Sequence, residues 1–547
     1  MEVITRIQTI CPQCHRLIEG RYMARGEEVY LEKTCPIHGD FSTFIAPSLS
    51  EYLEWTSTPT INIAPKAPAL IGANEAEEGS QCPLHCGLCH NHLQTPCCVL
   101  IEITQRCNQH CPYCFASSQD NENDPTENFL TLDVISKKLD YLLELGEDRP
   151  FNIQFSGGEP TLRDDLPDIL ALARSKGFPY LQVNTNGKRL AEESGYAERL
   201  KSAGASVIFL QFDGSNDKVY QELRNEDLWE TKQKAIEACR EAKLPVTLVP
   251  TLAKNINMDQ ISSMLEFLWA NLDIVAGIHF QPVSFFGRFP GDLKVQSKEN
   301  KVTLFELLRE IELASGGRIK TKDLVPMNTG HTLCGFHGTF LREDDGSISL
   351  LKEPEAVEDN DGSDSFDNLD GIGGSGGFDS FRSFDELCDK KEANELRRYG
   401  CEEDTQRTAK KQPCSCSKDP LQTIIKDRGF VLNKWGGKGQ GQNHSATSRE
   451  RDTCEKMPAG DPAGIQKNQK QLSMAGTPMD LDEFLGYMRS RMFTISAMAF
   501  QDLMSLDGER LKRCRVHVLA QDNRIIPFCS YNTLYREEDL EKVRCLR

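Results

Sequence analysis

The sequence lacks an excess of basic charge and lacks any long apolar run. Its 82 acidic and 63 basic residues give a formal net charge of −19 over 547 residues. Nucleic-acid binders generally carry a basic surface, so this balance argues against that class, while a local basic pocket for an anionic substrate stays open. No apolar stretch reaches the roughly 20 residues of a membrane-spanning helix, so we expect no transmembrane segment.

The first residues, "MEVITRIQTICPQC", also lack the charged segment and apolar run of a secretory signal peptide, so we expect a cytoplasmic protein. What the chain does have is 21 cysteines, many of them in tight clusters. In a reducing compartment, clustered thiols more often bind metal than form disulfides. The composition therefore predicts a metal-bearing protein of two or three domains.

Residues 1–50 predict a small metal-binding knuckle. "CPQC" supplies Cys11 and Cys14, and "CPIHG", after a predicted hairpin, supplies Cys35 and His38. Two short pairs flanking a hairpin are typical of a mononuclear tetrahedral site. Zinc is the default ion and a rubredoxin-like iron is the alternative. The alternative interpretation of this pattern is that the four side chains are unrelated and bind no metal.

From residue 98 to about 325, strand-like and helix-like segments alternate. Short apolar runs rich in Val, Ile and Phe predict six buried parallel strands, namely "CVLIEIT", "FNIQFSGG", "YLQVNTNG", "SVIFLQFDG", "PVTLVPTL" and "IHFQPVSF". Helical stretches such as "TLDVISKKLDYLLELG", with Thr131 as N-cap, separate them. Six βα units predict an α/β fold, a partial (β/α)6 TIM-like barrel with function at the carboxyl ends of its strands.

The loop after the first predicted strand carries Cys107, Cys111 and Cys114 at C-x3-C-x2-C spacing. A [4Fe–4S] cluster usually takes four thiolates, so three leave one iron open to an outside ligand. An open iron at the mouth of a barrel indicates catalysis rather than structure. On the same rim, "SGGEP" ends the second strand and "NTNG" ends the third. The two glycines let a ligand approach the backbone, and Glu159 offers acceptors for a cationic group.

This combination resembles the radical S-adenosylmethionine (SAM) superfamily. The resemblance implies that the three cysteines bind a [4Fe–4S] cluster whose open iron chelates the methionyl group of SAM. One electron then cleaves the sulfonium to a 5′-deoxyadenosyl radical, which abstracts hydrogen from an unactivated C–H bond. It implies cofactor contacts from the amino-group loop Gly157, Gly158, Glu159 and Pro160 and from the ribose candidates Asn184, Thr185 and Asn186.

The same cysteine spacing occurs earlier, at Cys82, Cys86 and Cys89, before the barrel begins. No GGEP-like loop follows these residues before the next strand, so they predict an auxiliary cluster that relays electrons or binds substrate. A zinc site that pins the knuckle to the barrel is the structural alternative. The candidates for a fourth ligand are Cys97, Cys98, His85, His90, His92 and a ligand from outside the chain.

The doubled motif behind the knuckle resembles one branch of the superfamily, which contains archaeal 7,8-dihydro-6-hydroxymethylpterin methyltransferase and tetraether lipid synthase. The resemblance implies methylation, or related C–C bond formation, on a pterin-like small molecule, with a reduced folate-type compound as carbon donor and a flavodoxin or ferredoxin as reductant. Coupling of lipid chains is the second possibility. An iron–sulfur electron carrier or scaffold and a zinc-only structural protein are the alternatives from other classes.

An acidic, glycine- and serine-rich segment interrupts the C-terminal part of the sequence. Low hydrophobicity predicts that most of this insert is disordered, with an auxiliary domain continuing after it. The predicted domains are the knuckle (1–50), a linker with the auxiliary motif (51–97), the radical SAM core (98–325), the insert (354–475) and a C-terminal auxiliary domain (326–353 and 476–547).

That C-terminal domain contains three more cysteines in ordered sequence. Cys334, Cys514 and Cys529 are candidates for a third cluster, which requires the domain to be continuous across the insert. Cys239, Cys388 and Cys545 have no partner at metal-binding spacing, so buried or spectator thiols are the preferred interpretation for these three. Nearby, "MDLDEFLGYMRSRMF" predicts an amphipathic helix, and "CRVHVL" with "NRIIPFC" predicts a hairpin.

Overall fold

The structure is a computed structural model of the chain, and it describes residues 2–65, 82–84, 86–89, 91–118, 130–145, 151–327, 329–351, 472–474, 477–479, 487–488, 490–537 and 539. The chain divides into two compact units, Met1–Leu387 with Arg491–Arg547, and Cys388–Ser490. In the second unit, β15 (Leu472–Met474) pairs antiparallel with β16 (Thr477–Met479). Apart from β15, the predicted insert lies outside the described residues.

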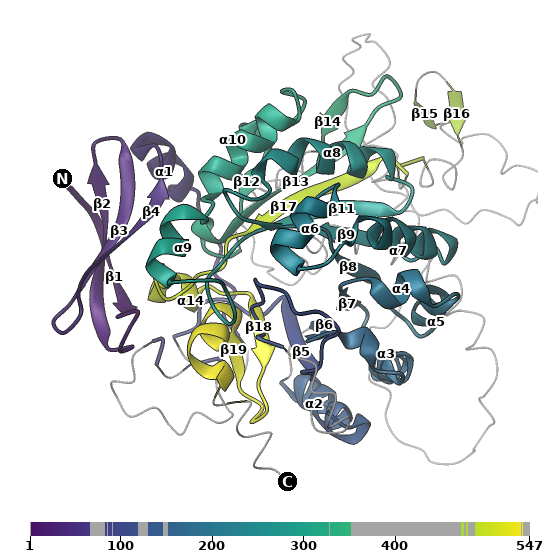
Figure 1. The fold of residues 1–547 in the computed structure, drawn as a ribbon, viewed down its shortest axis with the longest axis horizontal. Helices are drawn as coiled ribbons and strands as arrows, with labels where there is room; N and C mark the ends of the chain where they lie inside the picture. The colour runs from purple at the N-terminus through teal and green to yellow at the C-terminus, as the bar shows by residue number, and fades with distance from the viewer. Residues whose placement is uncertain are drawn as a thin grey trace, which may run out of the picture. The chain divides into compact units, whose positions relative to one another are not determined.

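The knuckle is a four-stranded antiparallel sheet followed by one helix (Figure 1). Its strands alternate buried and exposed side chains, so one face of the sheet is covered. Tyr22 and Leu31 on that face pack with Tyr52 of the helix and with Phe305 of the barrel, which joins the two parts through a shared core. The elements are β1 (Glu2–Ile10), β2 (Leu17–Arg25), β3 (Glu28–Cys35), β4 (Gly39–Ala46) and α1 (Leu49–Thr56).

Six parallel strands form the centre of the barrel sheet, and they are the six that the sequence predicts. Each strand pairs with the next one along the chain. The α/β class and the partial barrel are therefore confirmed. The strands are β5 (Cys98–Thr104), β6 (Asn152–Gly157), β7 (Leu181–Thr185), β8 (Val207–Gln211), β9 (Val246–Val249) and β11 (Val275–Pro282), with the two-residue β10 (Thr251–Leu252) beside β11.

Helices follow these strands on the outer side of the sheet (Figure 1). The predicted N-cap is confirmed, since Thr131 Oγ1 accepts a hydrogen bond from Val134 N at 3.3 Å. No helix among the described residues is both long and apolar enough to cross a membrane. The helices are α2 (Leu132–Glu144), α3 (Leu166–Ser175), α4 (Lys188–Glu192), α5 (Tyr196–Ser202), α6 (Asp217–Arg224), α7 (Trp229–Glu241), α8 (Ile261–Ala270), α9 (Leu293–Glu299) and α10 (Leu304–Ala314).

The C-terminal residues extend the same sheet at both edges, which the sequence did not indicate. At one edge β17 (Met492–Met498) runs parallel to β11 and antiparallel to β13 (Gly335–Arg342). At the other edge β18 (Val516–Leu519) runs parallel to β5 and forms the predicted hairpin with β19 (Ile525–Pro527). Short elements complete this part, namely β12 (Val325–Pro326), β14 (Ile348–Leu350), α14 (Gly508–Lys512), α15 (Phe528–Ser530) and the π-helical turn η5 (Tyr531–Tyr535).

The two faces of the barrel strands differ in polarity. On β6, Ile153 and Phe155 belong to the apolar core that the helices share, whereas Gln154 lies on the opposite face. On β7, Val183 belongs to the same core and Gln182 lies on the opposite face. Since the helices cover the outer face, the amides line the inner one. This polar inner face and the loops at the carboxyl ends of the strands position the site.

Candidate metal and cofactor site

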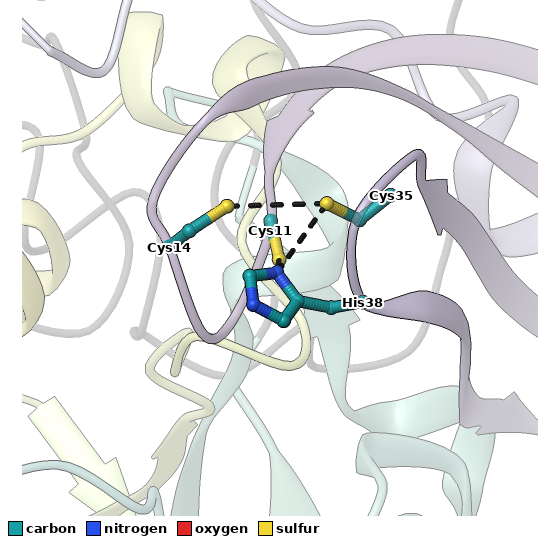
Figure 2. A group of neighbouring side chains, drawn as sticks. All are labelled: Cys11, Cys14, Cys35 and His38. Carbon is teal, nitrogen blue, oxygen red and sulfur yellow. Dashed lines mark hydrogen bonds between the residues drawn. The ribbon is translucent and has the colours of Figure 1, made fainter.

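Four side chains of the knuckle converge on one point (Figure 2). Cys11 and Cys14 lie in the turn between β1 and β2, while Cys35 and His38 lie where β3 turns into β4. Their ligand atoms all lie within 4.8 Å of one another, and Cys14 Sγ is 3.9 Å from Cys35 Sγ. His38 Nδ1 lies 3.5 Å from Cys11 Sγ and 3.6 Å from Cys35 Sγ.

These separations are those of a tetrahedral metal site. Bonds of about 2.3 Å to sulfur and about 2.05 Å to nitrogen place two sulfurs about 3.8 Å apart, and a sulfur and a nitrogen about 3.5 Å apart. Burial raises the pKa of the Cys35 thiol, but the backbone N–H groups of Ile37 and His38 outweigh it and lower that pKa to about 6. A thiolate is the form that binds metal, so the knuckle residues fit a zinc or iron ion.

The knuckle also supports the loop that joins β17 to α14, residues 499–507. Lys33 Nζ donates to the Leu503 carbonyl at 2.8 Å, and Thr43 Oγ1 donates to the Met504 carbonyl at 3.0 Å. Burial lowers the pKa of Lys33 to about 7, which shows how completely β3 is covered there. A change in the knuckle is therefore transmitted to this loop.

Cys35→Ser tests the metal site. We expect the variant to lose one metal ion per chain and to unfold at a lower temperature, because structural zinc contributes about 10–16 kcal/mol of apparent binding free energy in small zinc-binding peptides. Metal analysis and a thermal melt measure the two effects. Ile37→Ser is the matched control, since this exposed neighbour supplies no ligand atom. Full metal content in Cys35→Ser would contradict the assignment.

The loop after β5, residues 105–115, carries the second predicted motif and is named the cluster loop. Cys107 and Cys111 are each 8% exposed, and Cys114 is half-buried. Cys114 N donates to the Arg288 carbonyl and Arg288 N donates to the Cys114 carbonyl, both at 2.9 Å. This two-way bridge fixes the end of the cluster loop to the segment that follows β11.

The three thiols of the cluster loop are spaced differently from the ligands of the knuckle. Among the described residues, only the knuckle brings three or more ligand atoms within 4.8 Å of one another, so the cluster-loop sulfurs are spread more widely. Thiolates around a [4Fe–4S] cluster bind different irons and need this wider spread. Burial raises the pKa of the Cys107 and Cys111 thiols, so bound metal is what would stabilise them as thiolates.

The two glycines of "SGGEP" lie directly against the start of the cluster loop. Gly158 N donates to the Thr104 carbonyl at 2.8 Å, and Glu159 N donates to the Arg106 carbonyl at 2.8 Å. A Cβ on Gly157 would lie 2.0 Å from the Thr104 oxygen, and a Cβ on Gly158 would lie 2.1 Å from the Arg106 oxygen. The backbone angle φ of Gly157 is +131°, a conformation that residues with a side chain rarely adopt. Glycine is therefore required by backbone packing against the cluster loop.

The Glu159 side chain, which the sequence offers as an acceptor for a cationic group, bonds to neighbouring protein groups. It is 2% exposed, and Oε1 accepts hydrogen bonds from Thr161 N, Thr161 Oγ1 and Thr185 Oγ1. Oε2 accepts from Asn186 N at 2.7 Å. The carboxylate thus fastens the loop after β6 to the loop after β7. A cationic group reaching this rim would meet the backbone carbonyls rather than a free Glu159 side chain. Pro160 follows as the first residue of a 3₁₀ turn, η1 (Pro160–Leu162).

The three ribose candidates differ in where their side chains lie and in what they contact. Thr185 is bonded to Glu159, and Asn186 Nδ2 donates to Asn108 Oδ1 of the cluster loop at 2.8 Å. Both residues therefore hold loops in place. Only Asn184 turns to the inner face of the barrel, where its Oδ1 accepts from Gln154 Nε2 at 3.0 Å.

A buried ion pair beneath the cluster loop was missed in the sequence. Arg224 of α6 makes two hydrogen bonds of 2.8 and 2.9 Å to Asp213, and Arg224 NH1 donates to the Tyr113 carbonyl inside the motif. Burial opposes both charges, but each partner outweighs it, so the pKa of Asp213 is lowered and that of Arg224 is raised. The guanidinium also offsets part of the rise that burial causes in the pKa of Cys111. The "DG" that ends the fourth strand was the available sequence signal.

Comparison with known proteins agrees with this geometry. The Radical SAM superfamily model matches residues 101–268, and the HMPTM N-terminal zinc ribbon domain matches residues 3–47. A 7,8-dihydro-6-hydroxymethylpterin dimethyltransferase of Methanocaldococcus jannaschii is 30% identical over 98% of this chain and 94% of its own length. The chain belongs to the radical SAM superfamily. It falls in the branch of that dimethyltransferase, and the predicted recognition is confirmed.

Other proteins match over a smaller part of the chain. A probable GTP 3′,8-cyclase of Methanococcus maripaludis is 29% identical over 33% of this chain and 59% of its own length. The crystal structure of Streptococcus suis SuiB bound to S-adenosylmethionine is 18% identical, with a TM-score of 0.33 over 41% of this chain and 48% of that one. A TM-score this low supports no conclusion by itself. Membership of the superfamily implies a [4Fe–4S] cluster and SAM.

The auxiliary motif lies against the C-terminal residues of this radical SAM protein. Ser530 Oγ donates to Cys86 Sγ at 3.0 Å, and Cys86 N donates to Tyr535 OH at 2.9 Å. Cys82 packs in the same apolar clusters as Cys86 and Cys529. Cys89, the third cysteine of the motif, is half-buried. Through Cys82 and Cys86 the motif lies beside the β18–β19 hairpin.

The candidates for a fourth ligand are only partly described. Cys97 Sγ donates to the Arg515 carbonyl at 3.4 Å, Cys98 is buried on β5, and His92 Nε2 lies 3.0 Å from the Cys514 carbonyl. His85 and His90 lie outside the described residues. The described contacts favour none of the candidates over the others.

The three cysteines of the C-terminal part are brought together from distant points in the chain. Burial raises the pKa of the Cys514 and Cys529 thiols, and proximity to Cys334 raises each further. Arg510 lies close enough to Cys334 for its own pKa to be raised by that thiol, against the effect of burial. Gln501 N donates to Cys529 Sγ at 3.2 Å. This arrangement is compatible with the third metal site that the sequence suggests.

Gly158→Ala tests the contact between "SGGEP" and the cluster loop. The new methyl group would collide with the Arg106 carbonyl, so we expect the cluster loop to shift and the reconstituted protein to lose about four iron atoms per chain. Iron and sulfide analysis measures the loss. Gly330→Ala is the control, because a Cβ there meets only ordinary contacts of 3.8 Å or more. Unchanged iron in Gly158→Ala would show that the contact is not needed for cluster assembly.

Proposed function

We propose that this radical SAM enzyme cleaves SAM at a cluster held by Cys107, Cys111 and Cys114 and methylates a carbon of a pterin-like small molecule. The observation that carries the proposal is the likeness to the pterin dimethyltransferase, which extends over 98% of this chain and includes the knuckle, the barrel and the C-terminal strands. A match confined to the barrel would indicate only the superfamily.

When bound, the cluster and SAM supply the 5′-deoxyadenosyl radical. The chain positions them. Gly157 and Gly158 let the loop after β6 lie directly against the cluster loop, Glu159 holds the neighbouring loop, and Arg224 bonds to the cluster loop. The burial of Cys107 and Cys111 keeps water from a reactive radical.

The inner face of the barrel favours a polar heterocycle over alkyl chains. Gln154 and Gln182 are buried there, and His279 Nδ1 lies 2.8 Å from Ser496 Oγ on the neighbouring strand. Burial lowers the pKa of His279 to about 4, so this imidazole is neutral at physiological pH. Hydrocarbon placed against this face would leave Gln182 Oε1, which has no hydrogen-bond donor among the described residues, without one, and that is costly. Lipid coupling has no comparable support.

The other metal sites complete the proposal. Cys82, Cys86 and Cys89 would hold an auxiliary cluster, and Cys334, Cys514 and Cys529 would hold a third, each relaying electrons or binding substrate. A zinc or iron ion in the knuckle would be structural. A reduced folate-type carbon donor, a flavodoxin or ferredoxin reductant and a cytoplasmic location belong to the same proposal.

Reductive cleavage of SAM tests the reaction class. Protein reconstituted with iron and sulfide and reduced with dithionite should convert SAM to 5′-deoxyadenosine, and Cys107→Ala should reduce this to background because one cluster ligand is lost. Mass spectrometry should then detect a methylated pterin when 7,8-dihydro-6-hydroxymethylpterin and a carbon donor are present.

Cys239→Ala is the control for this experiment, since Cys239 is a buried thiol of α7 outside every motif. It should retain cluster absorption and nucleoside formation. A colourless protein after anaerobic reconstitution would contradict the clusters. Cluster absorption without any nucleoside would favour an electron carrier or scaffold, and joined alkyl chains in place of methylated pterin would favour the lipid reaction.

A further inference from the structure

The inner faces of β6 and β7 carry three carboxamides that bond to one another. We propose that Gln182, with Gln154 and Asn184, forms the specificity site that reads the pyrimidine edge of the pterin substrate. This inference rests on the proposed function. It assigns substrate recognition to Gln154 and Gln182, which are not among the candidate SAM contacts, and to Asn184, which was expected to contact the ribose of SAM.

The geometry of the amide set leaves hydrogen-bonding capacity unused. Asn184 Oδ1 accepts from Gln154 Nε2 at 3.0 Å and from Gln182 Nε2 at 2.9 Å. Asn184 Nδ2 makes only a long contact of 3.4 Å to Ser156 Oγ. Gln182 is 1% exposed, yet its Oε1 accepts no hydrogen bond within the described structure. A buried amide oxygen without a donor is unfavourable unless a ligand supplies one.

The orientation of the set is fixed before any ligand arrives. Asn184 holds both glutamines by their amide nitrogens, so the position of Gln182 Oε1 follows from a network rather than from one flexible side chain. Gln154 and Gln182 are register partners on adjacent strands. A prearranged donor and acceptor set loses little entropy on binding and discriminates strongly between ligands.

The chemistry of the set matches a neutral heterocycle with donor and acceptor edges. The 2-amino-4-oxo edge of a pterin offers N–H donors for Gln182 Oε1 and a carbonyl acceptor for Asn184 Nδ2. The set itself carries no charge, so it would give no electrostatic attraction to a phosphate. An alkyl chain would leave Gln182 Oε1 unpaired. The amide set therefore favours a ligand with a 2-amino-4-oxo pyrimidine edge, as in a pterin, over a lipid.

The position of the set in the barrel agrees with this role. Asn184 lies two residues beyond Gln182 toward the carboxyl end of β7, and the same end of β6 carries Gly157 and Gly158. In parallel strands these ends share one rim, so the amides lie below the loops assigned to SAM. A substrate held by the amides would lie between them and the cofactor.

Binding of a pterin and of its 2-deamino analogue, in which an oxygen replaces the 2-amino group, tests the proposal. Affinities are measured by anaerobic fluorescence titration of the reconstituted enzyme. We expect the unaltered protein to bind the pterin ~10- to 100-fold more tightly than the analogue, because the analogue places a carbonyl oxygen where the 2-amino group would donate to Gln182 Oε1. This comparison requires no variant and so does not depend on a substitution that folds.

Gln182→Met then removes the amide at nearly constant shape. We expect it to weaken pterin binding by ~10- to 100-fold and to bind the two ligands equally. Gln221→Met is the control, because Gln221 is an exposed amide of α6 whose contact is with Asp227. It should match the unaltered protein, and all variants should retain cluster absorption.

The outcomes separate two failures. If the unaltered protein binds neither pterin nor analogue while it still forms 5′-deoxyadenosine, the pterin substrate is wrong and this inference falls with it. If the unaltered protein binds and methylates the pterin but Gln182→Met binds it equally well, the proposed function stands and the amide set is only a packing network.

Discussion

The close approach of two backbone segments is the constraint on which the site depends. Gly157 and Gly158 lie so near Thr104 and Arg106 that a single Cβ at either glycine would overlap a carbonyl oxygen. This contact sets the start of the cluster loop relative to β6. Glu159 and Asn186 then fix the loop after β7 to both. The first three strand ends of the barrel therefore form one rigid rim.

Much of this arrangement could be predicted from local sequence, because the signals involved are local. The six barrel strands are short apolar runs between helical segments, and the knuckle ligands occur in pairs at metal-binding spacing. The role of the Glu159 side chain could not be predicted. The sequence around Glu159 is the same whether its carboxylate bonds to Thr185 or to a ligand. Only the fold shows which donors surround that carboxylate. Asp213 and Arg224 were missed for a similar reason, since an ion pair between a strand end and a helix has no fixed spacing.

The C-terminal strands show a second limit of sequence interpretation. β17 and β18 complete the barrel sheet at opposite edges, although they follow the six central strands by many residues. "MFTISAM" was partly assigned to an amphipathic helix, but Met492 and Phe493 begin β17, and most of that predicted helix lies outside the described residues. Pairing between distant segments depends on which edge is exposed after the barrel forms. That information lies in the tertiary structure rather than in the pattern of either segment.

The two copies of the cysteine spacing have different surroundings, which agrees with the different roles proposed for them. The later copy lies against the glycine backbone of "SGGEP" and above a buried arginine. Around the earlier copy, Ser530 and Tyr535 bond to Cys86 and its backbone, so that copy is enclosed by the C-terminal residues. Phe528 contacts Phe115, which directly follows the later copy, with ring centroids 5.6 Å apart. This aromatic contact places the earlier motif close to the later one, as the proposed role of a helper centre requires.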